Sequence, residues 1–235
     1  MPGFFDFLNG VQRYAEDQGA IDRLNRRHDM LIAPLADQIE GARVLDLAAH
    51  DGRWAHAWAD AGAAKVIGIE GRAELVGRYD SFPDPDLRAR VQLEVGDIFD
   101  GMEARVAAGD TFDIVGVLGI FYHVMDHFRL LRLAAALGPK LIVIDSEFAL
   151  RPGPTITLAR EKTAKHMNAI EQTPGQEVAV VGIPSRAATE LMAEALGYRT
   201  EWLDWDVLKG PDRVGLQDYY RARNKRRGSC ILRPA

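Results

Sequence analysis

The chain has 235 residues, a formal net charge of -5 and a hydrophobic content of 47%, as is typical of a globular domain. The negative net charge argues against a general polyanion-binding surface. The single cysteine, Cys230, excludes an internal disulfide and a cysteine-based zinc site. The sequence lacks a secretion signal, and no apolar run approaches the roughly 20 residues that span a bilayer. We therefore expect a cytoplasmic protein with no membrane partner.

Residues 4–39 carry apolar side chains at helical spacing and precede the first predicted strand. Polar residues interrupt this pattern. Two interpretations stay open: an amphipathic helix pair packed on the edge of a sheet, or a cap over a site.

Strands and helices then alternate along the chain. Strands are predicted at residues 44–47, 65–69, 91–95, 113–118 and 141–144, and helices at 54–62, 72–79, 102–107 and 124–137. The strands are apolar enough to be buried on both faces, as in a parallel sheet with helices on each side. Repeated strand–helix units predict a doubly wound α/β fold.

The alternation is interrupted at residues 148–183, which contain strand-like runs at 155–158 and 178–181. Insertions of this length at strand ends usually shape a ligand site. A helix from Ser185 to residue 196, a strand at 199–206, a helix from about residue 212 and an antiparallel strand at 229–232 follow. We expect one domain, 1–235, divided into a helical cap (1–40), a core (42–147), the insertion (148–183) and closing elements (184–235).

The stretch from Val44 to Trp54 reads as strand, tight turn and helix. In an open parallel sheet, this is the place where nucleotide-like ligands bind, because backbone N–H groups at the start of the helix face the ligand. Small residues between Asp46 and Gly52 let the backbone approach a ligand closely.

Three more loops are expected at the carboxyl ends of strands. Glu70 lies about 20 residues after the turn, where an acid can accept hydrogen bonds from ribose hydroxyls. Asp97 and Ile98 offer a carboxylate and an apolar side chain, and residues 118–123 bring a small residue, aromatics and a histidine. Glu70 as a helix N-terminal charge and Asp97 as a helix cap are the structural alternatives. The joint order of these loops favours a binding site.

These residues resemble the class I S-adenosylmethionine-dependent methyltransferases, over about residues 42–144. In that family an aspartate is followed by Gly-x-Gly-x-Gly, whereas this loop keeps only Gly52, has the small Ala48, and departs at His50. The resemblance implies that Glu70 contacts the ribose. It further implies S-adenosylmethionine as cofactor, with binding residues Asp46, Ala48, Ala49, His50, Gly52, Glu70, Asp97, Ile98 and Leu118, of which Asp97 and Ile98 contact adenine and Ala49 and Leu118 lie near the methionine.

The motifs Leu-Asp-Leu-Ala-Ala-His-Asp-Gly-Arg-Trp, Phe-Tyr-His and Ile-Asp-Ser-Glu are similar to a narrower branch. That branch includes tRNA wobble-uridine modification enzymes and small-molecule and sugar O-methyltransferases. A dinucleotide-binding oxidoreductase is the rival class, but it needs Gly-x-Gly-x-x-Gly to approach a pyrophosphate. A sulfonium cofactor has no phosphate, so the acidic loop favours the methyltransferase.

His123 is the first choice for a general base, because it follows the fourth strand and histidine titrates near neutrality. Its alternative is a packing residue of an aromatic loop. His127 lies four residues on, where packing is the favoured interpretation, but we also name it as an acceptor-binding candidate. Tyr14 and Tyr122 are expected to orient the acceptor.

Asp126, Asp145 and Glu147 are weak candidates for Mg²⁺, since hard cations take carboxylates from adjacent loops. The alternative, that they cap helices or pair with arginines, is favoured, and no metal is predicted. The basic run 221–227 favours a solvated helix end over an RNA surface. Trp202 and Trp205 are expected in the core or in a dimer interface, and a homodimer is left open.

The sequence therefore predicts an S-adenosylmethionine-dependent O-methyltransferase acting on a hydroxyl of a sugar or specialised metabolite. A tRNA wobble-uridine methyl- or carboxymethyltransferase is the first alternative, which would make nucleic acid a partner. A non-catalytic cofactor-binding protein is the second.

Overall fold

The computed structural model describes residues 2–11, 13–165 and 167–235. A seven-stranded sheet in the order β3-β2-β1-β4-β5-β9-β8 forms its centre. The strands are β1 Arg43–Leu47, β2 Lys65–Glu70, β3 Val91–Val95, β4 Ile114–Leu118, β5 Leu141–Ala149, β8 Tyr198–Trp202 and β9 Lys225–Pro234. Strands β1 to β5 pair in parallel, and β9 runs antiparallel to both β5 and β8. The predicted doubly wound sheet with an antiparallel last strand is confirmed.

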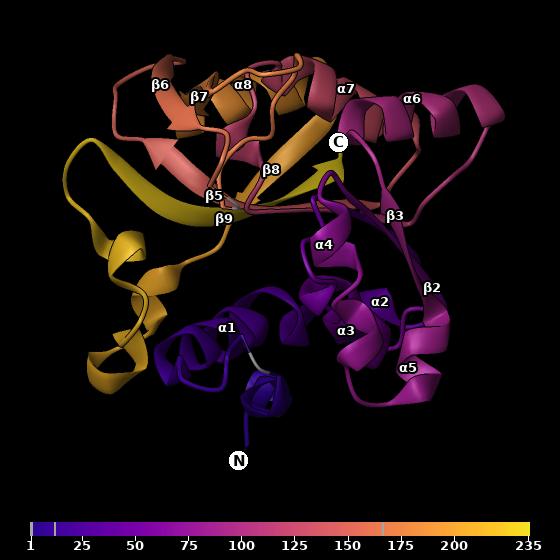
Figure 1. Cartoon of the computed structure of the whole chain (residues 1–235). Coiled ribbons are helices and arrows are strands. Elements are labelled where there is room, and N and C mark those ends of the chain that lie inside the picture. Colours follow the sequence, from indigo (N-terminus) through magenta and orange to yellow (C-terminus); the bar gives the residue numbers. More distant parts are fainter. Residues whose placement is uncertain (1, 12, 166) are drawn as a thin grey trace.

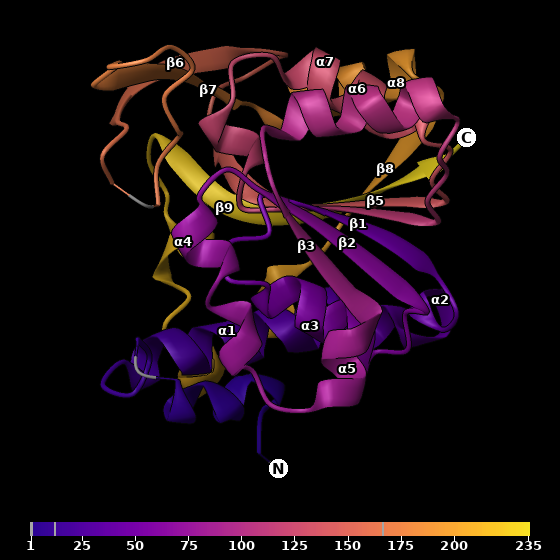
Figure 2. The same cartoon turned by 45° about the vertical axis from the view of Figure 1, so that its right-hand side comes forward.

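Helices cover both faces of this sheet. They are α1 Gln18–Leu31, α2 Ala36–Ile39, α3 Arg53–Asp60, α4 Ala73–Val76, α5 Pro85–Arg90, α6 Ile98–Ala108, α7 His127–Ala136 and α8 Arg186–Ala195. Helices α6, α7 and α8 lie on one face, and α1 to α5 lie on the other (Figures 1 and 2). Within the described ranges, no helix combines the length and apolarity that crossing a membrane requires.

The inserted segment forms its own two-stranded sheet from β6 Ile156–Lys162 and β7 Val178–Pro184. Figures 1 and 2 place this hairpin beyond one end of the main sheet, on the same side as α7 and α8. The two strand-like runs predicted in the insertion are therefore confirmed.

Strand β5 continues five residues beyond its predicted end at residue 144. Every residue of Leu141–Ala149 is buried, including Asp145 and Glu147. Polar residues usually mark the end of a buried strand, but here their side chains find charged partners inside the protein. Both carboxylates therefore belong to the strand itself and not to a loop after it.

Two predicted helical segments were wrong in extent or kind. The first segment divides into a 3₁₀ turn, Phe4–Gly10, and helices α1 and α2. The helix from about residue 212 is absent from the described residues, which instead form 3₁₀ turns at Gly210–Arg213 and Gln217–Tyr220. Gly215, with φ +81°, separates these turns. Residues 221–227 consequently lead into β9, so the basic run is no helix end.

The strand predicted at 199–206 was too long. Strand β8 ends at Trp202, and Trp205 lies in the following turn, buried against Tyr219 at 3.9 Å between ring centroids. The expected core packing of Trp205 is confirmed. Helix α5 was missed: Asp84 caps it by accepting from the Asp86 amide, and Pro85 occupies its first turn.

His56 of α3 is buried among aromatic rings below the sheet, within hydrogen-bond distance of the Tyr79 hydroxyl at 3.1 Å. Burial lowers the pKa of His56 from 6.5 to about 4. Below pH 6.5 the unfolded chain therefore binds a proton at His56 that the folded protein does not bind. The free energy of unfolding consequently decreases as the pH is lowered.

We expect the free energy of unfolding to decrease by up to about 3 kcal/mol between pH 6.5 and pH 4 from this residue. His56→Asn keeps a partner for Tyr79 and removes the titration, so its unfolding energy should vary less over that window. Denaturant unfolding at pH 7, 5.5 and 4 measures the difference. If the free energy of unfolding depends on pH equally in the two proteins, folding does not shift the pKa of His56.

Candidate active site

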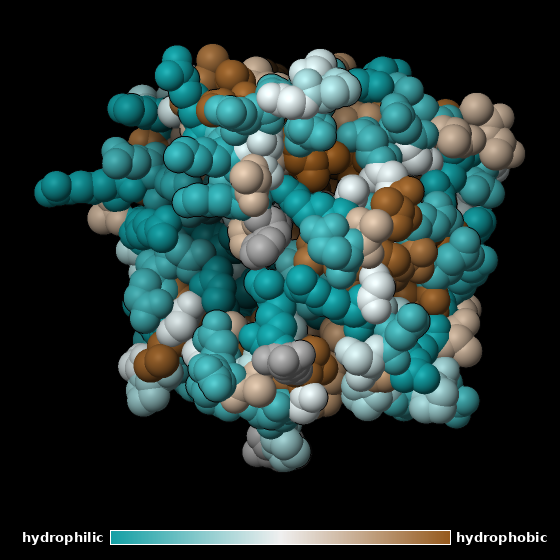
Figure 3. Space-filling view, in the orientation of Figure 1, coloured by the Kyte–Doolittle hydropathy of each residue, from teal (hydrophilic) through white to brown (hydrophobic). Residues whose placement is uncertain are grey.

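A cavity of about 540 Å³ opens at the carboxyl ends of β1, β2, β3 and β4. Hydrophilic residues dominate the surrounding face of the molecule (Figure 3). The predicted site residues that line the cavity are Ala48, His50, Glu70, Asp97, Ile98, Leu118, Tyr122 and His123. The four loops that the sequence singled out therefore meet at one place.

The first loop has the backbone of a glycine-rich turn but keeps only one glycine. Ala48, His50 and Gly52 have φ values of +56°, +57° and +80°, so each is left-handed. A Cβ on Gly52 would lie 2.5 Å from the Tyr79 ring, which explains why this position keeps glycine. Ala48 and His50 adopt the same conformation at a steric cost of roughly 1–2 kcal/mol each.

Ala48→Gly is expected to raise the free energy of unfolding by about 0.5–1 kcal/mol. Removing Cβ relieves the left-handed strain, which exceeds the entropy that glycine adds to the unfolded chain. Ala49→Gly is the matched control, because Ala49 is buried and its φ is not positive. Ala49→Gly should lower the free energy of unfolding in the same denaturant titration. If both variants change this free energy in the same direction, the backbone of Ala48 is not strained.

Glu70 ties the first two loops together. Its carboxylate accepts hydrogen bonds from the backbone amides of His50 and Arg72, each at 2.9 Å. The side chain is almost fully buried, and burial raises the pKa of Glu70. Each oxygen keeps a second lone pair for a ligand in the cavity.

Asp97 caps α6 and lines the cavity at the same time. Its Oδ1 accepts from the Phe99 amide at 2.8 Å and from the Asp100 amide at 3.3 Å. The capping alternative is therefore confirmed, and Oδ2 stays available for a ligand. Ile98, the next residue, contributes an apolar surface to the same wall.

Asp46, Ala49 and Gly52 were expected to contact the cofactor, but they lie outside the cavity lining. Ala49 packs on Gly68 so closely that a Cβ there would lie 2.7 Å away. Asp46 is buried beneath the loop, and burial together with nearby Glu70 raises its pKa to about 8. Asp46 Oδ2 has no hydrogen-bond partner among the described residues. These residues shape the loop from below.

Tyr14 was expected to orient the acceptor, but its hydroxyl donates to Asp51 at 2.5 Å in the interior. Arg53 Nε also donates to Asp51, at 2.6 Å, and the Arg53 guanidinium lies 5.2 Å from the Tyr14 ring centroid. The Arg53 side chain lines the cavity, and Tyr14 does not. Tyr14 thus holds the ion pair that positions Arg53.

His123 faces Glu161 of the inserted hairpin. Its Nδ1 lies 2.6 Å from Glu161 Oε2, which also accepts from the Ala169 amide at 2.9 Å. Burial opposes ionisation of Glu161, but the hydrogen bonds from His123 and Ala169 outweigh it and lower the pKa of the carboxyl. A carboxylate on Nδ1 fixes the imidazole and leaves Nε2 to take a proton.

Glu161 was not among the residues predicted from the sequence. Its signal was the alternation along β6, in which Ala159 and Glu161 are partly buried and their neighbours exposed. That alternation places Glu161 on the inward face of the hairpin. The loop after β6 also closes over the cavity: Arg72 donates to the carbonyls of Thr163, Lys165 and Asn168 at 3.1–3.3 Å. The prediction that the insertion shapes a site agrees with this geometry.

His127 was named as an acceptor-binding candidate, but it lies outside the cavity lining. Its ring nitrogens lie 3.0 Å from the carbonyl oxygens of Met125 and Gly182, and the side chain is 1% exposed. Burial lowers the pKa of His127. Both nitrogens face backbone within the protein, so His127 joins α7 to β7 and does not reach an acceptor.

The metal candidates have other partners. Asp126 caps α7 by accepting from the Arg129 amide, Asp145 pairs with Arg27 and Arg227, and Glu147 pairs with Arg221 and Lys225. Among the described residues, no group of three or more histidine, cysteine or acidic side chains is arranged to hold a metal ion. The expected alternative, in which these carboxylates cap or pair with arginines, describes what they do.

No protein-family model and no curated protein matches the chain. Solved structures do. The N-terminal domain of EvdMO1, crystallised in the presence of S-adenosylhomocysteine and D-fucose, has a TM-score of 0.62 at 19% identity, covering 91% of this chain and 83% of that domain. Magnesium protoporphyrin IX methyltransferase (ChlM) from Synechocystis PCC 6803, with bound S-adenosylhomocysteine, scores 0.56 at 13% identity, covering 98% of each chain.

The [4+2]-cyclase SpnF has a TM-score of 0.55 at 16% identity and covers 92% of this chain and 82% of its own. These likenesses show that the chain has the fold of the S-adenosylmethionine-dependent methyltransferases. A cyclase stands among methyltransferases on this fold, so the reaction has to be argued from the site.

Proposed function

We propose that the protein is an S-adenosylmethionine-dependent methyltransferase that acts on a hydroxyl of a small polar molecule such as a sugar or specialised metabolite. The observation that carries this proposal is the His123–Glu161 pair, at 2.6 Å, on the wall of the cavity that the four strand-end loops form. The fold favours S-adenosylmethionine as the cofactor, and the His123–Glu161 pair favours a reaction in which a hydroxyl loses its proton.

The cavity residues fit the cofactor. Glu70 offers buried carboxylate oxygens for the ribose hydroxyls, and Asp97 Oδ2 offers an acceptor for the adenine amine. Ile98 and Leu118 supply apolar walls for the adenine ring and the methionine chain. When bound, S-adenosylmethionine supplies an electrophilic methyl group to an attacking oxygen.

The chain's own residues then remove the acceptor proton. His123 Nε2 takes it as the oxygen attacks, and Glu161 stabilises the positive charge that develops on the imidazole. Tyr122, beside His123 at 4.0 Å between ring centroids, lines the same wall and orients the acceptor. The loop after β6 covers the cavity and excludes water from the reacting atoms.

Calorimetric titration with S-adenosylhomocysteine tests the cofactor assignment, using Asp97→Asn as the variant. Asparagine keeps the Oδ1 cap of α6 but places an N–H₂ donor opposite the adenine amine. We expect saturable binding by the wild type and about tenfold weaker binding by the variant, or about 1.4 kcal/mol.

Asp84→Asn is the matched control, because Asp84 caps α5 in the same way and lies outside the cavity lining. Its affinity should equal that of the wild type. Absence of binding in the wild type, or equal losses in both variants, would refute the proposed cofactor site.

A further inference from the structure

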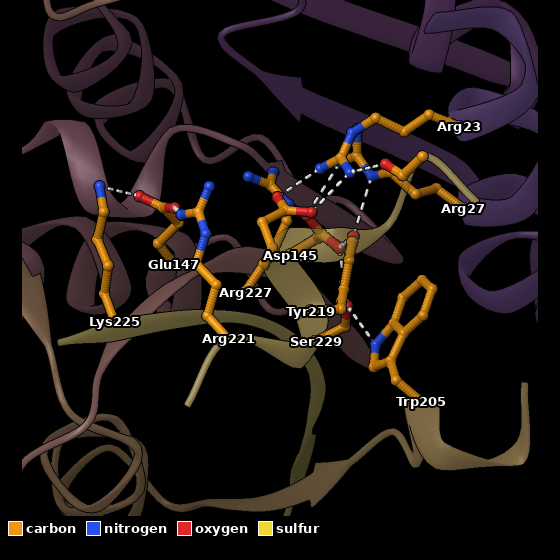
Figure 4. A network of polar contacts seen from close by, with 12 residues as sticks. Arg23, Arg27, Asp145, Glu147, Trp205, Tyr219, Arg221, Lys225, Arg227 and Ser229 are labelled. Carbon is orange, nitrogen blue, oxygen red and sulfur yellow. Dashed lines mark hydrogen bonds and ion pairs between the residues drawn. The ribbon is translucent and has the colours of Figure 1, made fainter. Parts of the chain in front are cut away.

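Three cationic side chains line the part of the cavity that is formed by α1 and β9, next to β5. Arg27 from α1 and Lys225 and Arg227 from β9 line the cavity. Arg27 and Arg227 are each 7% exposed. Figure 4 shows these side chains converging on Asp145 and Glu147 of β5. The buried cations call for anionic partners, because an uncompensated charge is costly away from water.

Asp145 is the one carboxylate that pairs with both the Arg27 and the Arg227 guanidinium groups among the described residues. Arg27 Nη2 and Arg227 Nε donate to the same oxygen, Asp145 Oδ1, at 2.9 and 2.6 Å. The other oxygen accepts from the hydroxyls of Tyr219 and Ser229. Despite complete burial, the charges of Arg227 and Arg27 lower the pKa of Asp145 to about 2, so it carries one negative charge against two positive charges.

Glu147 has the same imbalance. It pairs with Arg221, at 2.7 Å, and with Lys225. The remaining carboxylate facing Lys225 is Glu161, which His123 and the Ala169 amide already engage. The wall built from β5 and β9 therefore carries more positive than negative charge.

Two other arginines of the cavity are paired with carboxylates, and a third, Arg72, donates to backbone carbonyls of the loop after β6. Arg23 makes a two-pronged pair with Asp218, both bonds at 2.7 Å, and Arg53 pairs with Asp51. On the side of the cavity formed by β5 and β9, the excess positive charge therefore lies at Arg27, Arg227 and Lys225.

Donors of this wall are available to a ligand. Arg27 uses Nε on the Tyr219 hydroxyl and Nη2 on Asp145, and Nη1 has no partner among the described residues. Arg227 reaches Asp145 through Nε, and its other donors, the two Nη groups, have the Tyr122 side chain as a neighbour in the same cavity wall. Its centre lies 5.6 Å from the Tyr122 ring, on the wall that also holds His123.

We propose that the methyl acceptor carries an oxyanion (a carboxylate, phosphate or sulfate) that binds Arg27 and Arg227 while its hydroxyl meets His123. This inference rests on the proposed function, because it assigns a group to the acceptor. Arginine forks recognise such anions by paired, charge-assisted hydrogen bonds. The anion supplies the charge that Asp145 alone does not, and Asp145 holds both forks in place.

Titration of the S-adenosylhomocysteine-saturated protein with acetate, inorganic phosphate and sulfate, at constant ionic strength, tests the proposal. At least one anion should bind saturably, and Arg27→Met or Arg227→Met should weaken it at least about tenfold. Arg221→Met is the matched control, because it removes a charge from the same network at a half-exposed residue outside the lining. It should change affinity less than about twofold.

Arg227→Lys separates a loss of anion binding from a loss of folding. Lysine keeps the positive charge beside Asp145 but lacks the two-pronged guanidinium. Its affinity for the anion should fall, and an affinity equal to that of the wild type would overturn the proposal. Failure of all three anions to bind, or equal loss in Arg221→Met, would also overturn it and leave the proposed function standing. Absence of S-adenosylhomocysteine binding would remove both.

The anion has one competing source, a carboxymethyl group on the cofactor sulfur. S-adenosylhomocysteine with a carboxymethyl group on sulfur is therefore titrated beside S-adenosylmethionine. Similar affinities are expected. A preference of tenfold or more for the carboxymethyl compound that disappears in Arg227→Met would place the anion on the cofactor and overturn its assignment to the acceptor.

Discussion

Replacing His123 by alanine is expected to lower the rate of methyl transfer by roughly 10²–10⁴-fold, the usual contribution of a general base. The affinity for S-adenosylhomocysteine should stay within about threefold, because Glu70 and Asp97 are untouched. Added imidazole should restore part of the rate by entering the space that the side chain leaves. Initial rates with tritiated S-adenosylmethionine and calorimetry measure the two quantities.

Glu161→Gln accompanies this variant, because it preserves a hydrogen-bond acceptor for His123 Nδ1 and removes the charge. We expect a smaller loss of rate that imidazole does not rescue, as befits a positioning residue. If His123→Ala loses rate and cofactor affinity equally, or imidazole has no effect, His123 is a structural residue of the cavity wall.

Asp145→Asn is expected to destabilise the protein by about 3–5 kcal/mol. The variant leaves Arg27 and Arg227 buried with no carboxylate between them, and removing one member of a buried ion pair has a cost of this size. A chain of this length should lose roughly 10 °C in melting temperature. Calorimetric or denaturant unfolding at pH 7 measures the change.

Glu147→Gln is its control on the same strand. Its partners Arg221 and Lys225 are half exposed, so water can solvate them and the loss should stay below about 1 kcal/mol. Asp145→Asn combined with Arg227→Met should recover part of the stability, since one unpaired charge is removed. Additive losses in the double variant would mean that Asp145 and Arg227 are not coupled.

The sheet was predictable because buried parallel strands read as unbroken apolar runs. Strands β1 and β4 agree with their predicted ranges to within one residue. The same pattern placed Glu70, Asp97 and His123 at strand ends, which a parallel sheet brings to one edge. The apolar pattern therefore predicted which strand-end loops line the cavity.

The wall that contains Arg27, Arg227 and Glu161 could not be predicted, because its contacts join residues that are far apart in the sequence. Asp145 lies 118 residues from Arg27 and 82 from Arg227, and no local pattern links them. Without those arginines, Asp145 resembled a residue after the strand. Glu161 lies 38 residues from His123, inside an insertion without strong periodicity.

His50 shows a different limit. Residue type alone suggested a departure from a glycine pattern, whereas the backbone keeps the left-handed turn that the pattern requires, with φ +57°. Its ring lies within hydrogen-bond distance of Arg53 Nη2, and its Nδ1 is 3.2 Å from Asp51. Burial, with help from the charges of Arg53 and Arg13, lowers the pKa of His50. His50 therefore joins the polar contacts that hold Arg53 at the cavity.

Transfer of a methyl group to a hydroxyl is best tested by identifying the labelled product. The protein is incubated with tritiated S-adenosylmethionine and a cell extract separated into small-molecule and tRNA fractions, and labelled products are treated with mild alkali. We predict label in the small-molecule fraction that survives alkali, as a methyl ether does. Label in tRNA, label released by alkali as from a methyl ester, or no transfer to either fraction would contradict it.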